Sequence, residues 1–113
     1  MHELSLAESM VREITSYIEK EKIKKVISVT VIMGNLSRVQ KEPFEFAFPI
    51  VIEGTILEGC KLNIEQQPGI VNCSDCGEDT QLDIPLVKCS NCGSRNVKFT
   101  HGKEFLIKSI EVE

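Results

Sequence analysis

Four of the five cysteines form two Cys-x-x-Cys pairs, Cys73/Cys76 and Cys89/Cys92, and a glycine follows each pair. Two residues between thiols let one tight turn aim both sulfurs at a single ion, and the glycine accepts a backbone conformation that a side chain would resist. Two such turns complete a tetrahedral shell of four sulfurs. We therefore predict a structural Zn(II) site, because four protein ligands leave no open position for catalysis. Mononuclear iron for electron transfer is the alternative occupant.

The sequence Met1-His2-Glu3 is a second arrangement that suits a metal ion. Initiator methionine is usually kept before a bulky residue, so we expect the α-amine to belong to Met1. That amine, the deprotonated amide nitrogen of His2 and its imidazole can close adjacent chelate rings, and the amide or carboxylate of Glu3 can supply a fourth ligand. Nitrogen ligands in a plane suit Ni(II) or Cu(II) rather than tetrahedral zinc. A labile, solvent-facing site of this kind indicates metal delivery rather than catalysis.

Two other residues with metal-binding side chains have simpler interpretations. Cys60 alternates with Leu62 and Ile64 on one face of an expected strand, so we interpret it as a small buried hydrophobic residue. His101 lies just beyond the cysteine segment. We favour a solvated loop histidine there over an accessory metal ligand.

Composition narrows the classes of function. A chain of 113 residues has room for one domain or for a small domain with a metal-stabilised addition, which excludes a large multidomain enzyme. The net charge of −4 and the acidic segment Ile70–Asn96, which has no aromatic residue, argue against nucleic-acid binding. No nucleophile–base pair, phosphate-binding loop or open metal site is evident. We therefore expect a protein that is not an enzyme.

The same sequence gives expectations about location. The first apolar stretch is interrupted by polar residues, unlike a secretory signal. The longest strongly apolar run without a charge, Phe46–Ile52, is far shorter than the roughly 20 residues needed to cross a bilayer. We expect a cytoplasmic protein without a membrane segment. In a reducing cytosol, paired cysteines favour metal binding over disulfides.

Hydrophobic periodicity predicts the elements that must position these residues. Apolar residues recur every three or four positions near the N-terminus, which predicts a helix that ends within Lys20–Lys25. They are Leu4, Ala7, Val11, Ile14 and Ile18, with Met10 and Tyr17 widening the stripe. The β-branched run Val26–Met33 then predicts a strand, which Gly34 ends.

A second helix is predicted to begin at Pro43 and to bury Phe44, Ala47, Phe48 and Val51. Because Pro49 removes a backbone hydrogen bond, we expect a kink or an early end near Phe48. The alternating segment Cys60–Glu65 predicts a second strand, and Phe105–Val112 predicts a third.

These elements predict an α+β fold with a small three-stranded sheet, two helices and an inserted four-cysteine zinc-ribbon module. Gln66–Gly69 marks a shift in composition. We assign residues 1–68 and 98–113 to an α+β domain that carries the N-terminal metal-binding residues, and residues 69–97 to the zinc module. That module has few large apolar residues, so the metal must substitute for a core.

Four sequence features together resemble the HypA/HybF hydrogenase maturation factors, and the resemblance covers essentially the whole chain. They are Met1–Ser5, Gly54–Gly59, the two cysteine pairs and Gly102–Phe105. The resemblance implies a nickel metallochaperone that binds Ni(II) as cargo through Met1, His2 and Glu3 and holds a structural Zn(II) with the four cysteines.

The resemblance also implies partners. It points to nickel insertion into the large subunit of [NiFe]-hydrogenase with the GTPase HypB as partner, and in some bacteria to urease maturation proteins. It implies no nucleic-acid or membrane partner. A homodimer is one possible oligomeric state. The alternative function is a zinc-ribbon adaptor that makes protein–protein contacts without handling nickel.

Overall fold

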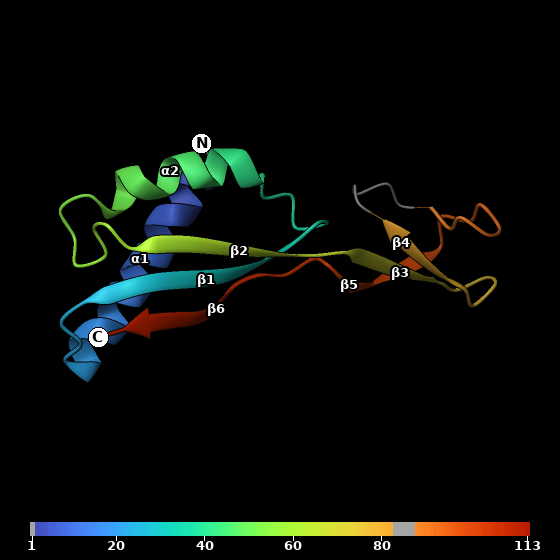
Figure 1. Ribbon diagram of the computed structural model, residues 1–113. Coiled ribbons are helices and arrows are strands. Elements are labelled where there is room, and N and C mark those ends of the chain that lie inside the picture. The colour runs from blue at the N-terminus through green and yellow to red at the C-terminus, as the bar shows by residue number, and fades with distance from the viewer. Residues whose placement is uncertain (1, 83–87) are drawn as a thin grey trace. The chain divides into compact units, whose positions relative to one another are not determined.

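The computed structural model describes residues 2–82 and 88–113, and of His2 it describes the backbone only. Two helices and six strands form within these residues, so the predicted α+β class is confirmed (Figure 1). Their order is α1 (His2–Glu21), β1 (Val26–Gly34), α2 (Lys41–Ile52), β2 (Lys61–Gln67), β3 (Gly69–Cys73), β4 (Asp79–Leu82), β5 (Val97–His101) and β6 (Phe105–Val112).

The predicted three-stranded sheet is present, with the strand order β2-β1-β6. Strand β6 covers the predicted segment Phe105–Val112, and β1 extends the predicted strand by Gly34. Side chains of β1 are buried in Val26, Val29, Val31 and Met33, as expected for a central strand. The cysteine segment lies between β2 and β6 in the chain, so its expected insertion between the second and third strands of this sheet is confirmed.

A second three-stranded sheet, with the order β4-β3-β5, carries the cysteine segment and was not predicted. Strand β3 pairs antiparallel with both neighbours, Val71 lying opposite Thr80 on one side and Phe99 on the other. A bulge between Ile70 and Val71 shifts the register with β5. Only Val71 is a fully buried aliphatic residue in these short strands, which is why no apolar run revealed them.

Helix α1 buries the predicted stripe except Leu4, which is half-buried. Its buried side chains are Ala7, Met10, Val11, Ile14 and Ile18, and this packing rather than helix propensity stabilises an amphipathic helix. Tyr17, expected to widen the stripe, is instead 51% exposed. It lies beside Ile107 and Ile110 of β6 in a shallow groove.

Helix α2 corrects two expectations. It begins at Lys41 rather than Pro43, and it continues through Pro49 to Ile52 rather than ending near Phe48. Proline costs a helix the bond to the carbonyl four residues earlier, which here belongs to Glu45. Glu45 and Pro49 are both exposed, so water can hydrate that carbonyl and the helix continues. Ile52 is buried and Val51 only half-buried.

The chain divides into two compact units, and neither is continuous in sequence. Met1–Val31, Gln40–Ile64 and Ile107–Glu113 form the first, and Ile32–Val39 and Glu65–Leu106 form the second. Helices α1 and α2 pack against each other within the first unit. The second unit contains all four paired cysteines.

Three glycines of the second unit meet where chain segments approach closely. A Cβ on Gly34 would lie 2.0 Å from the carbonyl oxygen of Gly102, and a Cβ on Gly102 would lie 2.4 Å from the Cα of Gly69. Leu36 N–H donates to the Gly102 carbonyl at 2.8 Å, and Gly34 N–H donates to the Glu104 carbonyl at 2.8 Å. These positions need glycine because the neighbouring backbone occupies the space of a side chain.

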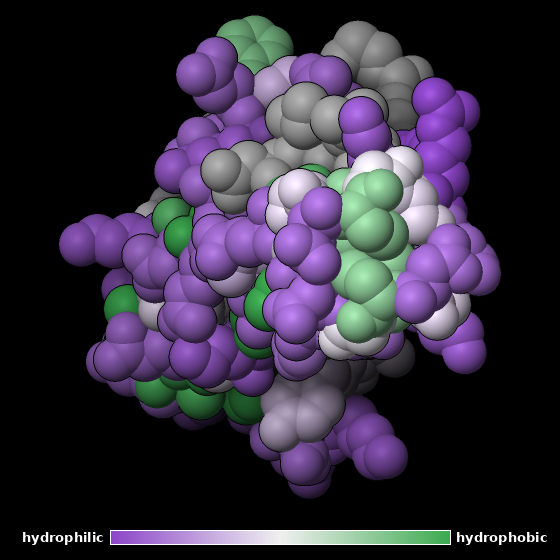
Figure 2. All heavy atoms as spheres, turned by 90° about the vertical axis from the view of Figure 1, so that its right-hand side faces the viewer, coloured by the Kyte–Doolittle hydropathy of each residue, from purple (hydrophilic) through white to green (hydrophobic). Residues whose placement is uncertain are grey.

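The surface is predominantly polar in the view of Figure 2, where hydrophilic side chains cover most of the visible face and hydrophobic ones form separate patches. Neither described helix combines the length and the apolar character that crossing a bilayer requires.

Candidate metal centre

The first cysteine pair lies in a tight turn at the end of β3. Cys76 N–H points at the sulfur of Cys73, with a distance of 3.4 Å from N to Sγ, and Gly77 N–H donates to the Cys73 carbonyl at 2.9 Å. Cys73 N–H in turn donates to the carbonyl of Glu78. Gly77 has a φ of +80°, a conformation that glycine adopts without strain. The turn therefore needs the Cys-x-x-Cys-Gly spacing.

The second pair repeats this geometry. Cys92 N–H approaches the Cys89 sulfur at 3.5 Å, Gly93 N–H donates to the Cys89 carbonyl at 3.0 Å, and Cys89 N–H donates to the carbonyl of Ser94. Gly93 has a φ of +78°. The two turns thus have the same geometry, and each turn presents two sulfurs.

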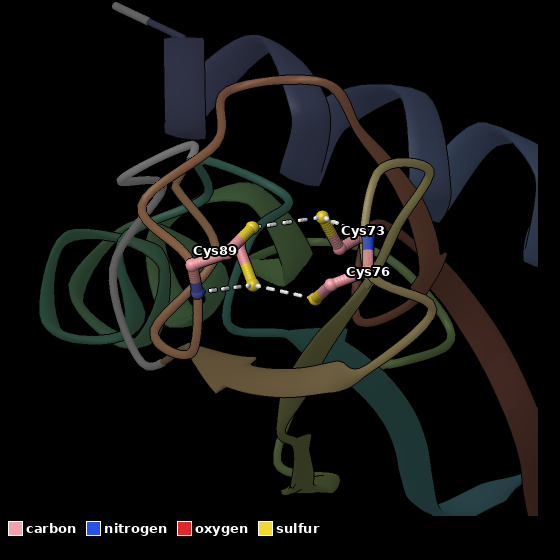
Figure 3. A group of neighbouring side chains, drawn as sticks. Cys73, Cys76 and Cys89 are labelled. Atoms are coloured by element: carbon pink, nitrogen blue, oxygen red, sulfur yellow. Dashed lines mark hydrogen bonds between the residues drawn. The ribbon is translucent and has the colours of Figure 1, made fainter.

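The four sulfurs gather around one point. All lie within 4.8 Å of one another, and the Sγ–Sγ distance is 3.6 Å both for Cys73–Cys92 and for Cys76–Cys89. A tetrahedral ion with Zn–S bonds of about 2.3 Å has edges of roughly 3.8 Å. Figure 3 shows Cys73, Cys76 and Cys89 with their sulfurs turned toward one another. The arrangement fits one tetrahedral metal ion.

Hydrogen bonds between the two turns help to hold them together. Ser94 Oγ donates to the Asp75 carboxylate, Asn96 Nδ2 lies 3.5 Å from the other oxygen of that carboxylate, and Ser74 N–H donates to the Asn96 carbonyl at 2.8 Å. Asn91 Nδ2 lies 3.6 Å from the sulfur of Cys76, where it can offset thiolate charge. These supporting residues could not be recognised from the sequence, because their partners are known only once both turns are placed.

The thiols differ in acidity. The N–H of Cys92 donates to Cys89 and lowers its pKa to about 6, and the N–H of Cys76 likewise lowers the pKa of Cys73. The N–H of Ser94 acts to lower the pKa of Cys92, but the three neighbouring thiols and burial outweigh it and raise that pKa to about 12. Four thiolates so close together need a bound cation, which the geometry can accommodate.

The N-terminal residues are only partly described. Met1 and the side chain of His2 lie outside the described residues, and α1 begins at His2. Glu3 is half-buried as a residue, and its Oε2 accepts the backbone N–H of Gln40 at 3.4 Å in an exposed contact. Gln40 is the N-cap residue of α2, so Glu3 places negative charge at the positive end of that helix. No sequence signal pointed to this contact across 37 positions.

Cys60 and His101 stand apart from the four-sulfur cluster. Cys60 precedes β2 and is half-buried rather than fully buried, because it lines an open cavity beside α2. Burial raises the pKa of its thiol. His101 ends β5 with an exposed ring, and its Nδ1 lies 3.1 Å from Thr100 Oγ1.

Comparison with known proteins gives a consistent picture. A family model described as "HypA: Hydrogenase/urease nickel incorporation, metallochaperone" matches residues 1–112. Hydrogenase maturation factor HypA of Methanocaldococcus jannaschii is 40% identical, with 100% of this chain and 98% of that protein covered. The factor of the same name from Caldanaerobacter subterraneus is 39% identical, with both chains covered completely.

Two solved structures resemble this fold. The solution structure of the nickel metallochaperone HypA from Helicobacter pylori has a TM-score of 0.67 and 26% identity, with 97% of this chain and 96% of that chain covered. A second, titled a solution structure of HypA protein, has a TM-score of 0.72 and 27% identity, with 100% and 97% covered.

Proposed function

Because the chain belongs to the HypA family of nickel-incorporation metallochaperones for hydrogenase and urease, we propose that it binds Ni(II) at its N-terminus and delivers it for [NiFe]-hydrogenase maturation. The family match over residues 1–112 is the observation that carries the proposal, since it includes both candidate metal sites. Nickel is the cargo in this scheme, and the protein performs no turnover of its own.

The proposed nickel ligands are the amine of Met1, the amide and imidazole nitrogens of His2, and a group from Glu3. Helix α1 begins at His2. The first four N–H groups of a helix have no intrahelical acceptor, so deprotonating the amides of His2 and Glu3 breaks no helix hydrogen bond. The helix dipole also favours negative charge at this end, which supports amide anions as ligands.

In the proposed nickel site, Glu3 can supply the fourth ligand through its carboxylate or through its amide nitrogen. Its carboxylate already accepts the Gln40 N–H, so using that group means giving up this contact or sharing it. Its amide nitrogen is the other candidate, and it would complete a plane of nitrogens suited to Ni(II).

Zinc is the ion we propose for Cys73, Cys76, Cys89 and Cys92. Four thiolates fill a tetrahedral shell and leave no open position, so the ion would supply cross-linking rather than chemistry. In this scheme residues 69–97 form the zinc module, and residues 1–68 with 98–113 carry nickel. Iron would give a coloured protein, so a colourless sample with one equivalent of zinc tests the assignment.

The proposed partners are those expected for this role. They are the GTPase HypB, the large subunit of [NiFe]-hydrogenase and, where urease is made, its maturation proteins. Delivery to these proteins would take place in the cytoplasm. A protein that hands over an ion needs a labile site, which exposed nitrogen ligands at a chain end provide.

The nickel proposal is tested by titrating untagged protein with Ni(II) and comparing two histidine variants. The sequence has two histidines, so His101→Gln is a matched control for His2→Gln. We expect His2→Gln, or an extension that blocks the α-amine, to abolish tight binding, whereas His101→Gln keeps it. Unchanged affinity in His2→Gln would refute the proposed site and favour the zinc-ribbon adaptor without nickel function.

The zinc proposal is tested with Cys73→Ala. We expect this variant to lose its zinc and the amide signals of folded β3–β5, because Cys73 is one of the two buried ligands. Nickel binding should largely survive, since none of the proposed nickel ligands is a cysteine. If loss of zinc abolished nickel binding outright, the proposed separation of the two roles would be wrong.

A further inference from the structure

Helix α2 leaves an apolar surface uncovered within the first compact unit. Phe46 is 73% exposed and Ile50 is 55% exposed. Phe46, Pro49, Ile50 and Glu53 are spaced by three or four residues, so they lie along one side of the helix. We call this side, together with the cavity beside it, the α2 face. Large apolar side chains this exposed indicate a contact surface when they adjoin a cavity.

The cavity beside these residues has an apolar floor and an acidic rim. Its volume is about 430 Å³, and Phe48, Ile52 and Leu62 supply apolar surface. Glu45, Glu53 and Glu58 also line it, whereas no lysine or arginine is among its lining residues. The combination suits an apolar side chain that enters the cavity between positively charged neighbours.

Pro49 adds a hydrogen-bond acceptor at this rim. It has no N–H to donate to the carbonyl of Glu45, so that carbonyl has no partner four residues later in the helix. Glu45 and Pro49 both line the cavity. A lysine or arginine of a partner can therefore find a carbonyl as well as carboxylates at the same place.

From these observations we infer that the α2 face is a docking site for a basic amphipathic segment of a protein partner, with an apolar side chain in the cavity and Lys or Arg against Glu45, Glu53 and Glu58. A second copy of this chain is a poorer occupant, because a two-fold contact through this face would bring the acidic rims together. An anionic lipid surface would be repelled for the same reason.

The inference rests on the proposed function only in that a delivery protein must dock on other proteins. Docking on α2 requires no nickel. Loss of nickel binding in His2→Gln should therefore leave docking intact, and loss of docking should leave nickel binding intact. The proposal of nickel binding and the inference of docking on the α2 face can therefore be refuted independently.

The test uses the full-length protein labelled with ¹⁵N and a helical peptide with leucines along one side and lysines elsewhere. A matched peptide carries glutamates in place of the lysines. We expect the lysine peptide to bind, to shift amide signals of α2 and the cavity, and to bind more weakly as salt is raised. We expect no binding of the glutamate peptide.

Variants of exposed residues locate the site without disturbing the fold. Phe46→Ser should weaken binding of the lysine peptide by about tenfold or more, as expected for a central aromatic contact. Glu45→Gln with Glu53→Gln should weaken it severalfold. Leu106→Ser is the apolar control, since Leu106 is 45% exposed on β6, and it should leave affinity unchanged.

A charge control and the oligomeric state complete the experiment. Glu8→Gln with Glu19→Gln removes two exposed charges of α1, so equal weakening there would show attraction to net charge and overturn the inference. Equal binding of both peptides, or amide shifts confined to other surfaces, would also overturn it. So would sedimentation that shows a dimer which Phe46→Ser dissociates, because the occupant would then be a second copy.

Discussion

Substitution of Gly102 by alanine tests the close approach of chain segments in the second compact unit. Gly102 has a φ of +94°, and a Cβ there would lie 2.4 Å from the Cα of Gly69 and 2.8 Å from the carbonyl oxygen of Pro68. Ordinary contacts of a Cβ begin at 3.4 Å, so the backbones must separate by about 1 Å. Both neighbours are main chain, which cannot move aside as a flexible side chain can.

The expected cost combines three effects. Alanine in the left-handed region costs about 1–2 kcal/mol. Overpacking costs about 1–3 kcal/mol. The separation also strains the bond from Leu36 N–H to the Gly102 carbonyl, and a lost hydrogen bond costs about 1 kcal/mol. Alanine regains somewhat less than 1 kcal/mol by restricting the unfolded chain. We expect Gly102→Ala to lower the free energy of unfolding by about 2–5 kcal/mol.

Alanine substitutions at two other glycines distinguish the cost of backbone strain from the cost of steric overlap. Gly77 has a φ of +80° and open space at its Cβ position, so Gly77→Ala should cost only about 1 kcal/mol. Gly34 has no positive φ but would overlap the Gly102 carbonyl, so Gly34→Ala should cost about 2–4 kcal/mol. Urea unfolding of the metal-loaded protein, followed by circular dichroism, measures all three. If Gly102→Ala cost no more than Gly77→Ala, the close approach would be refuted.

Three further predictions concern other parts of the molecule. Phe44→Ala should lower the free energy of unfolding by about 3–5 kcal/mol, because Phe44 is 0% exposed. Phe46→Ala should change it by about 0.5 kcal/mol or less, because Phe46 is 73% exposed, and urea titrations measure both variants. Pro49→Ala should raise the melting temperature and add about 2 kcal/mol, because the bond to the Glu45 carbonyl is restored; an unchanged melting point would contradict this. Loading zinc at pH 7 should release fewer than four protons, because the lowered pKa of Cys89, about 6, leaves that sulfur largely a thiolate before the metal binds. Calorimetry in buffers of different ionisation enthalpy counts the protons, and release of four would contradict the prediction.

Elements with strong hydrophobic patterns could be predicted from the sequence, and their bounds agree closely with the structure. The stripe of α1 and the β-branched run of β1 each bury an apolar face, so pattern and packing agree there, whereas the apolar residues of β6 are half-buried or exposed. Strands β3, β4 and β5 could not be found this way. Their pairing depends on the two cysteine turns and on backbone hydrogen bonds, and Val71 is their one fully buried aliphatic side chain.

Contacts between residues far apart in the sequence could not be predicted either. The cysteine spacing predicted a four-sulfur cluster, because the turn geometry is local. The contact of Glu3 with Gln40 depends on how α2 packs against α1, and Cys60 is half-buried only because a cavity opens beside α2. Pro49 misled the prediction of the helix end, since an exposed proline can be hydrated where a buried one could not.

The discontinuity of both compact units has a consequence for how the chain folds during synthesis. Strand β6, at residues 105–112, pairs with β1, so the first sheet cannot be completed until β6 leaves the ribosome. The cysteines end at residue 92, and their contacts join residues closer together in sequence. Contacts with small sequence separation form sooner. The four-sulfur cluster can therefore close on a metal ion before the sheet β2-β1-β6 is complete.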